Sequence, residues 1–155
     1  MARGLVVRIF DELFAMGALK AGDTVIDPFG GIGSTAITGA PKGCRVVCVE
    51  LEKKFCALAV ETFELHRRDW EAMGYPLPVM VQGDSRQLRQ HVGPVLAECV
   101  VSSPPFMENN VNIGAVGDTP AKRQQIHESK PRPDSYGTSP GQLGAMPSGD
   151  VSAIV

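Results

Sequence analysis

The run CRVVCVE, Cys44 to Glu50, constrains the fold most, because its centre from Val46 to Val49 is apolar without alternation. Strands with this pattern are covered on both faces and occur mainly in parallel sheets. Neighbouring parallel strands need a crossover connection, which is usually a helix. The rest of the chain is therefore expected to supply helices before and after this strand.

The residues before this strand follow that expectation. Apolar side chains from Ala2 to Met16 fall on one face of a predicted helix, and the short apolar strand TVID follows at Thr24 to Asp27. A second helix is predicted to begin at Ser34-Thr35. Pro41-Lys42-Gly43 then forms a turn into CRVVCVE.

The same alternation continues after Glu50. A strand is predicted at Val79 to Val81, a loop and short helix lead to about His91, and a fourth strand runs from Ala97 to Ser102. The order β-α-β-α-β-α-β predicts a right-handed, doubly wound α/β sheet. One face of the helix after Glu50 is predicted to consist of Phe55, Leu58, Ala59, Thr62, Phe63 and His66.

Composition limits the class of protein. The 155 residues are 43% hydrophobic with a formal net charge of −2, which suits one soluble domain with an apolar core. No apolar run approaches the roughly 20 residues that span a bilayer, and no signal peptide is recognised, so we expect a cytoplasmic protein with no membrane partner. No metal site is expected. The four cysteines, Cys44, Cys48, Cys56 and Cys99, are predicted to be buried reduced thiols.

Three loops after predicted strands carry residues suited to binding. DPFGGIGST, Asp27 to Thr35, is a glycine-rich turn into a helix, where a ligand can approach the backbone closely, although a plain tight turn has the same appearance. Glu50 suits a ribose diol, and a charged strand end is the alternative. Asp84, in VQGDSRQL, suits an adenine amino group, but a helix N-cap also explains it.

The fourth predicted strand ends in ECVVSSPPF, Glu98 to Phe106. Proline fixes φ near −65°, so Pro104-Pro105 forms a stiff corner with set carbonyl directions. This is either a plain strand end or a holder for a flat substrate group. All four segments fall at the carboxyl ends of successive strands, where ligands bind in open α/β sheets.

DPFGGIGS resembles the DPFxGxG motif of amino-group DNA methyltransferases, and SSPPF resembles their SPP[YF] catalytic motif, in the same order, over residues 3–106. The resemblance implies a Rossmann-like class I methyltransferase sheet of parallel strands with flanking helices. It also implies S-adenosylmethionine as cofactor and duplex DNA with a flipped base as partner, in a site-specific enzyme of the restriction–modification kind.

The resemblance also implies roles for single residues. The methionine part of the cofactor would lie on the glycine-rich loop, its ribose on the Glu50 carboxylate and its adenine beside Asp84. The amine of the substrate base would lie at the proline corner. The cofactor-binding residues would be Asp27, Pro28, Phe29, Gly30, Gly31, Gly33, Glu50, Asp84 and Ser85, and the catalytic residues would be Ser103, Pro104, Pro105 and Phe106.

The chemistry of methyl transfer fits that corner. The exocyclic amine of a base is a poor nucleophile because its lone pair is delocalised into the ring. Acceptors at the Ser103 hydroxyl and the Pro104 carbonyl would draw the nitrogen toward tetrahedral geometry for in-line attack on the sulfonium methyl group. Phe106 would stack on the flipped base. Within the family, Ser103 favours cytosine N4 over adenine N6.

Two features depart from that family. About four of its seven strands are recognised, so we expect a fragment or natural truncation whose fourth strand is an exposed edge, covered by a homodimer or second chain. Duplex-binding domains usually have a basic face, but the net charge is −2 and the basic stretch lies at 119–133. The expected division is a methyltransferase half-domain at 1–106 and a Gly/Pro/Ser-rich segment at 107–155, for which contact with DNA and disorder are the two alternatives. An RNA or protein amino-methyltransferase, or a non-catalytic remnant that binds the cofactor or self-associates, stays open as an alternative.

Overall fold

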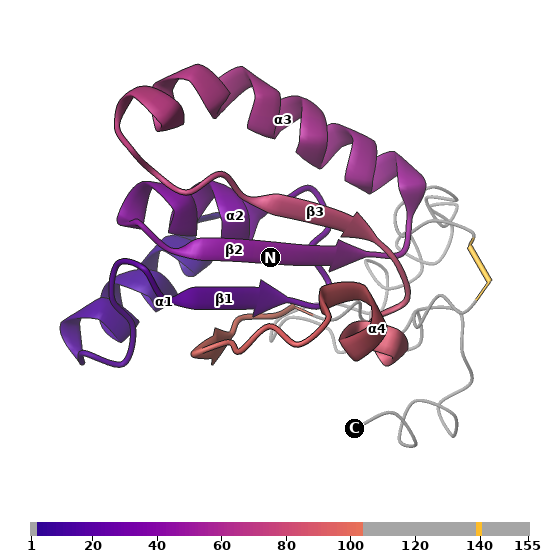
Figure 1. Ribbon diagram of the computed structural model, residues 1–155, viewed down its shortest axis with the longest axis horizontal. Helices are drawn as coiled ribbons and strands as arrows, with labels where there is room; N and C mark the ends of the chain where they lie inside the picture. The colour runs from indigo at the N-terminus through magenta and orange to yellow at the C-terminus, as the bar shows by residue number, and fades with distance from the viewer. Residues whose placement is uncertain (1–2, 104–138, 141–155) are drawn as a thin grey trace, which may run out of the picture. The chain divides into compact units, whose positions relative to one another are not determined.

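The protein is described by a computed structural model that covers residues 3–103 and 139–140. The chain divides into two units, and the elements below belong to the first, Met1–Pro104. Helices and strands alternate as predicted (Figure 1). The helices are α1 (Arg3–Ala15), α2 (Ser34–Gly39), α3 (Lys53–Ala72) and α4 (Leu88–Val92), with short 3-10 helices η1 (Ala40–Lys42) and η2 (Ser85–Gln87); the strands are β1 (Thr24–Asp27), β2 (Arg45–Glu50), β3 (Val79–Gln82) and β4 (Cys99–Val100).

The strands form one parallel sheet in the order β3-β2-β1-β4, which confirms the predicted fold class. Val25 of β1 lies in register with Val46 of β2 and with Cys99 of β4. The chain moves outward from β1 to β3 and then crosses back to the other side of β1 for β4. The strand order therefore reverses beside β1, and this is where open α/β sheets bind ligands.

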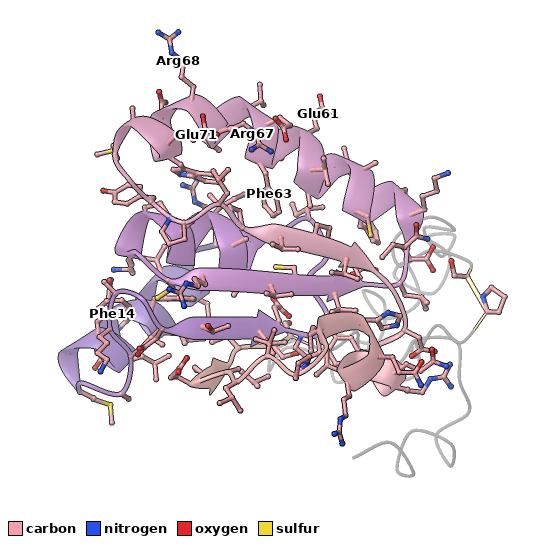
Figure 2. All side chains as sticks on the ribbon, in the orientation of Figure 1. Phe14, Glu61, Phe63, Arg67, Arg68 and Glu71 are labelled. Carbon is pink, nitrogen blue, oxygen red and sulfur yellow. The ribbon has the colours of Figure 1, made fainter. Side chains whose placement is uncertain are left out.

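The core lies between the sheet and helices α1, α2 and α3. Phe10 of α1 and Phe63 of α3 pack in one apolar cluster with Val25, Val46 and Cys48 of the strands. Figure 2 shows Phe63 pointing from α3 toward the sheet. In Figure 1 the short helix α4 lies in front of the sheet and α1 lies behind it. The α/β layers expected from the alternation are thus present in the described residues.

The prediction of which residues form the buried face of α3 is partly wrong. Ala59 and Phe63 are buried as expected, but Leu58 is 49% exposed and His66 is exposed. The buried face of the helix instead includes Trp70, which is 5% exposed and lies beyond the predicted stripe. Trp70 has more apolar surface to bury than His66, and the His66 ring stacks against it with centroids 5.3 Å apart.

The described cysteines are reduced, as predicted. Cys44, Cys48 and Cys56 are buried, Cys99 is partly buried, and all four are free thiols. Burial raises the pKa of the Cys56 thiol to about 11 and also raises the pKa of Cys48, so neither is ionised at neutral pH. Among the described residues, no group of three or more His, Cys, Asp or Glu side chains has the arrangement of a metal site.

Strand β4 is shorter than predicted. Only Cys99 and Val100 pair as a strand, although Val101 still donates its N–H to the carbonyl of Ile26 at 3.0 Å. Before the strand, the Glu98 side chain accepts the N–H of Thr24 at 2.6 Å and takes the place of a ladder bond. As predicted, β4 is an edge strand of the described sheet, and Val100 is 59% exposed.

No helix among the described residues combines the length and the apolar character needed to cross a membrane.

The packing of α2 gives a test of this fold. A Cβ atom at Gly39 would lie 2.7 Å from Val46 Cγ2 and 2.9 Å from the Phe10 ring, whereas one at Gly4 would meet nothing within 4 Å. Gly39→Ala should therefore lower the free energy of unfolding by about 1–3 kcal/mol, the usual cost of overpacking. Gly4→Ala should leave it unchanged or raise it by up to about 1 kcal/mol. Urea unfolding measures both, and equal effects would contradict the described packing.

Candidate functional site

The glycine-rich loop begins at a buried carboxylate. Asp27 ends β1 with 4% exposure, and its Oδ1 accepts the N–H of Phe29 at 3.0 Å. Its Oδ2 accepts a short hydrogen bond from the Thr35 hydroxyl in the first turn of α2. Desolvation raises the pKa of Asp27, and these two hydrogen bonds oppose that rise. Asp27 thus joins both ends of the loop, while Pro28 and Phe29 are partly buried beside it.

Two glycines of the loop are required by packing. The N–H of Gly30 donates to the carbonyl of Val49 at 2.8 Å, and a Cβ there would lie 2.6 Å from Cys48 Cβ. Gly33 has φ 80°, and a Cβ there would lie 2.7 Å from the Phe63 ring. Both glycines were predicted to line the cofactor surface, and close contact with β2 and α3 already accounts for them.

Gly31 differs from its neighbours. Its φ is 53°, a conformation that glycine adopts without strain, yet a Cβ at this position would meet nothing within 4 Å. Its N–H donates to Glu50 Oε2 at 2.8 Å. The loop is therefore tightly packed at Gly30 and Gly33 and open at Gly31, beside a carboxylate.

Glu50 joins three elements at the end of β2. Besides the N–H of Gly31, its carboxylate accepts the N–H of Glu52 through Oε1 at 2.8 Å, directly before α3. The side chain is only partly buried. Each carboxylate oxygen has a second lone pair, so the group retains acceptor capacity for a ligand hydroxyl.

Asp84 lies after β3 and next to the end of β2. The N–H of Gly83 donates to the Glu50 carbonyl at 2.9 Å, which joins the two strand ends. Asp84 caps η2 by accepting the N–H of Arg86 at 2.9 Å, and the Arg86 guanidinium bonds both carboxylate oxygens. These bonds hold the pKa of Asp84 below its usual value. The N-cap alternative is confirmed, and the partly buried Ser85 begins η2.

The proline corner is described only at its start. Ser103 is partly buried and follows Val101, whose N–H bonds β1. The other residues assigned to catalysis, Pro104, Pro105 and Phe106, lie outside the described residues. Because β4 pairs with β1, the start of this corner and the glycine-rich loop follow neighbouring strands of the sheet.

Three polar side chains of this region were not predicted. Thr35 bonds Asp27, and it stands inside the motif DPFGGIGST, so its place in the first turn of α2 was a usable signal. His91 Nε2 and Ser102 Oγ are buried without a hydrogen-bond partner among the described residues. Nothing in the local sequence distinguishes these two atoms, because burial depends on contacts between distant segments.

No protein-family model matches the chain, and no curated protein matches it in sequence. Solved structures do match. A putative RNA methyltransferase, PH1948 from Pyrococcus horikoshii, is 18% identical with a TM-score of 0.50, covering 68% of this chain and 46% of that chain. TrmN from Thermus thermophilus is 22% identical with a TM-score of 0.48, covering 61% and 27%. Magnesium protoporphyrin IX methyltransferase from Synechocystis PCC 6803, with bound SAM, is 21% identical with a TM-score of 0.48, covering 64% and 43%.

The likeness to PH1948 shows the fold. The described residues form part of a Rossmann-like class I methyltransferase fold, as the sequence predicted. The chain spans less than half the length of each of these three proteins. None of the three is named as a DNA methyltransferase, so that finer resemblance stays a prediction.

The raised pKa of Asp27 predicts a pH-dependent contribution to stability. Its folded pKa lies above the unfolded value of about 3.9. The native state therefore binds more protons between these two values, and the free energy of unfolding falls as the pH rises through that window. In Asp27→Asn, this fall above about pH 4 should be smaller in a pH series of urea unfolding. Asp69→Asn, on an exposed position of α3, is the control, and equal slopes in both variants would contradict the effect.

Proposed function

We propose that this chain binds S-adenosylmethionine at the carboxyl ends of β1, β2 and β3 and transfers its methyl group to the exocyclic amine of a nucleic-acid base. One observation carries the proposal. The hydrogen bond from Gly31 to Glu50 places a partly buried carboxylate beside the one loop glycine whose Cβ direction is open. That arrangement suits a ligand with a diol that approaches the backbone closely.

The remaining groups suit the other parts of the cofactor. The lone pairs left on Glu50 would accept the two ribose hydroxyls, and Asp84 would accept from the adenine amino group. The Arg86 guanidinium bonds both oxygens of the Asp84 carboxylate, which keeps Asp84 ionised and therefore a hydrogen-bond acceptor. The methionine part would lie over the loop from Asp27 to Gly33.

Transfer is proposed at Ser103. The Ser103 hydroxyl and the Pro104 carbonyl would accept hydrogen bonds from the amine, so that its nitrogen lone pair faces the sulfonium methyl group. The new N–C bond forms as the S–C bond breaks, and the amine then releases one proton to water. This is catalysis by positioning and electrostatics, with no covalent enzyme intermediate.

Cytosine N4 of DNA is the first substrate to test, with adenine N6 second, because SSPPF resembles the motif of that family. RNA is the alternative to DNA as the nucleic-acid substrate, since PH1948 is named as a putative RNA methyltransferase. The net charge of −2 means that the chain as a whole lacks the excess of basic residues that is typical of domains with many phosphate contacts. A homodimer or a second chain is proposed to cover β4 and complete the sheet.

Glu50→Ala tests the cofactor site. Removing the carboxylate takes away the proposed acceptor for the ribose and also the partner of the Gly31 N–H, so the dissociation constant for S-adenosylmethionine should rise by at least about tenfold. Isothermal titration calorimetry measures this value. Glu61→Ala is the matched control, because Figure 2 shows Glu61 pointing away from the sheet on α3.

Circular dichroism should show that both variants remain folded. If folded wild type does not bind S-adenosylmethionine, the proposed function is wrong for this chain. If Glu50→Ala binds as well as Glu61→Ala, the cofactor lies elsewhere.

Ser103→Ala tests the proposed transfer site. Losing an acceptor aimed at the reacting amine should lower the rate of methyl transfer by about 100-fold. Ser102→Ala is the matched neighbour, with the same change in volume one position away, and it should retain at least about a third of the wild-type rate. Transfer of a radiolabelled methyl group to cytosine-containing DNA, adenine-containing DNA and RNA measures the rate and identifies the substrate.

Equal rates in the two serine variants would remove Ser103 from the mechanism. Labelling of protein alone would support the protein methyltransferase alternative, and binding of the cofactor with no transfer would support a non-catalytic remnant.

A further inference from the structure

His91 has an unexplained buried nitrogen next to the proposed cofactor site. Within the described part of the chain, the buried side-chain atoms without a hydrogen-bond partner are His91 Nε2 and Ser102 Oγ. A buried polar atom left unpaired is unfavourable, because it has lost its hydrogen bonds to water without replacement. Native proteins keep few such atoms, and each calls for a physical reason. For His91 the surroundings supply one.

The His91 ring lies directly on Gly83. A Cβ at Gly83 would be 2.4 Å from His91 Nε2 and 2.5 Å from Cε1, so any larger residue would displace the ring. Gly83 is the residue between β3 and Asp84, and its N–H bonds the Glu50 carbonyl. The glycine therefore lets the Nε2 edge of the imidazole reach the strand ends that carry the two proposed cofactor carboxylates.

The two polar groups flanking this point are complementary to adenine. The ionised Asp84 carboxylate only accepts hydrogen bonds, whereas an imidazole that carries a proton on Nε2 donates one there. Adenine carries an amino group, which donates, next to ring nitrogens that accept. Hypoxanthine, with an oxygen in place of the amino group, presents an acceptor toward Asp84 instead.

We propose that His91 is a specificity-determining residue, whose Nε2–H donates to an adenine ring nitrogen of the cofactor while Asp84 accepts from the adenine amino group. This inference rests on the proposed function, because it places the adenosyl group at the ends of β2 and β3. Bound cofactor would then satisfy the unpaired nitrogen, and the Asp84–His91 pair would reject a 6-oxo purine.

The test compares two substitutions at His91. His91→Phe keeps a ring of similar size without a donor, and His91→Gln puts an amide N–H near the position of Nε2. The probe is S-adenosylhomocysteine, the product form of the cofactor, with S-inosylhomocysteine as the competitor, both titrated by calorimetry. His91→Phe should weaken binding of the adenosyl compound by about tenfold, whereas His91→Gln should stay within about threefold of wild type.

Stability separates this role from a structural one. Because Nε2 has no partner to lose, His91→Phe should keep the wild-type midpoint of thermal unfolding in the absence of ligand. Wild type should also prefer the adenosyl over the inosyl compound, and His91→Phe should reduce that preference. A slowly exchanging Nε2–H signal of His91 in proton NMR, present only with S-adenosylhomocysteine, is the direct signature.

Three results would overturn the proposal. Equal binding by wild type and His91→Phe would remove His91 from recognition while leaving the cofactor site in place. Equal loss in His91→Phe and His91→Gln would assign the effect to the shape of the imidazole and not to its donor. Absence of binding by folded wild type would remove this inference together with the proposed function.

Discussion

The described site depends on the glycine-rich loop bonding the end of β2. The N–H groups of Gly30 and Gly31 donate to the Val49 carbonyl and the Glu50 carboxylate at 2.8 Å each. The same carboxylate accepts the N–H of Glu52 before α3. One side chain therefore sets the end of a strand, the path of a loop and the start of a helix. A ligand bound by Glu50 would meet a surface whose shape is already set, and preorganisation of this kind lowers the cost of binding.

The glycines of this loop meet two different demands. Gly30 and Gly33 leave room for Cys48 and Phe63, which brings the loop close to β2 and α3. Gly31 has a positive φ with open space on its Cβ side. One short segment must therefore pack closely against β2 and α3 and also leave its backbone accessible at Gly31, which explains why it contains several glycines close together.

The reversal of strand order beside β1 brings distant parts of the sequence together. Val101 bonds Ile26 across 75 positions, so Ser103 follows the strand next to the one that ends in Asp27. On the other side of β1, Gly83 bonds Glu50 and brings Asp84 and His91 to the end of β2. The residues proposed to bind the cofactor and the substrate amine thus lie at or after the carboxyl ends of four adjacent strands of one sheet.

The sequence determined the alternation of helices and strands, the parallel sheet and the loops at its carboxyl ends, because periodicity, unbroken apolar runs and glycine act over short distances. The tertiary structure decided which face of α3 is buried, since Trp70 competes with His66 for the core. The tertiary structure also requires glycine at positions 30 and 33, because a Cβ there would clash with Cys48 or Phe63. It leaves His91 Nε2 buried without a hydrogen-bond partner among the described residues. Those outcomes depend on which side chains meet across the sheet, and a local pattern does not contain that information.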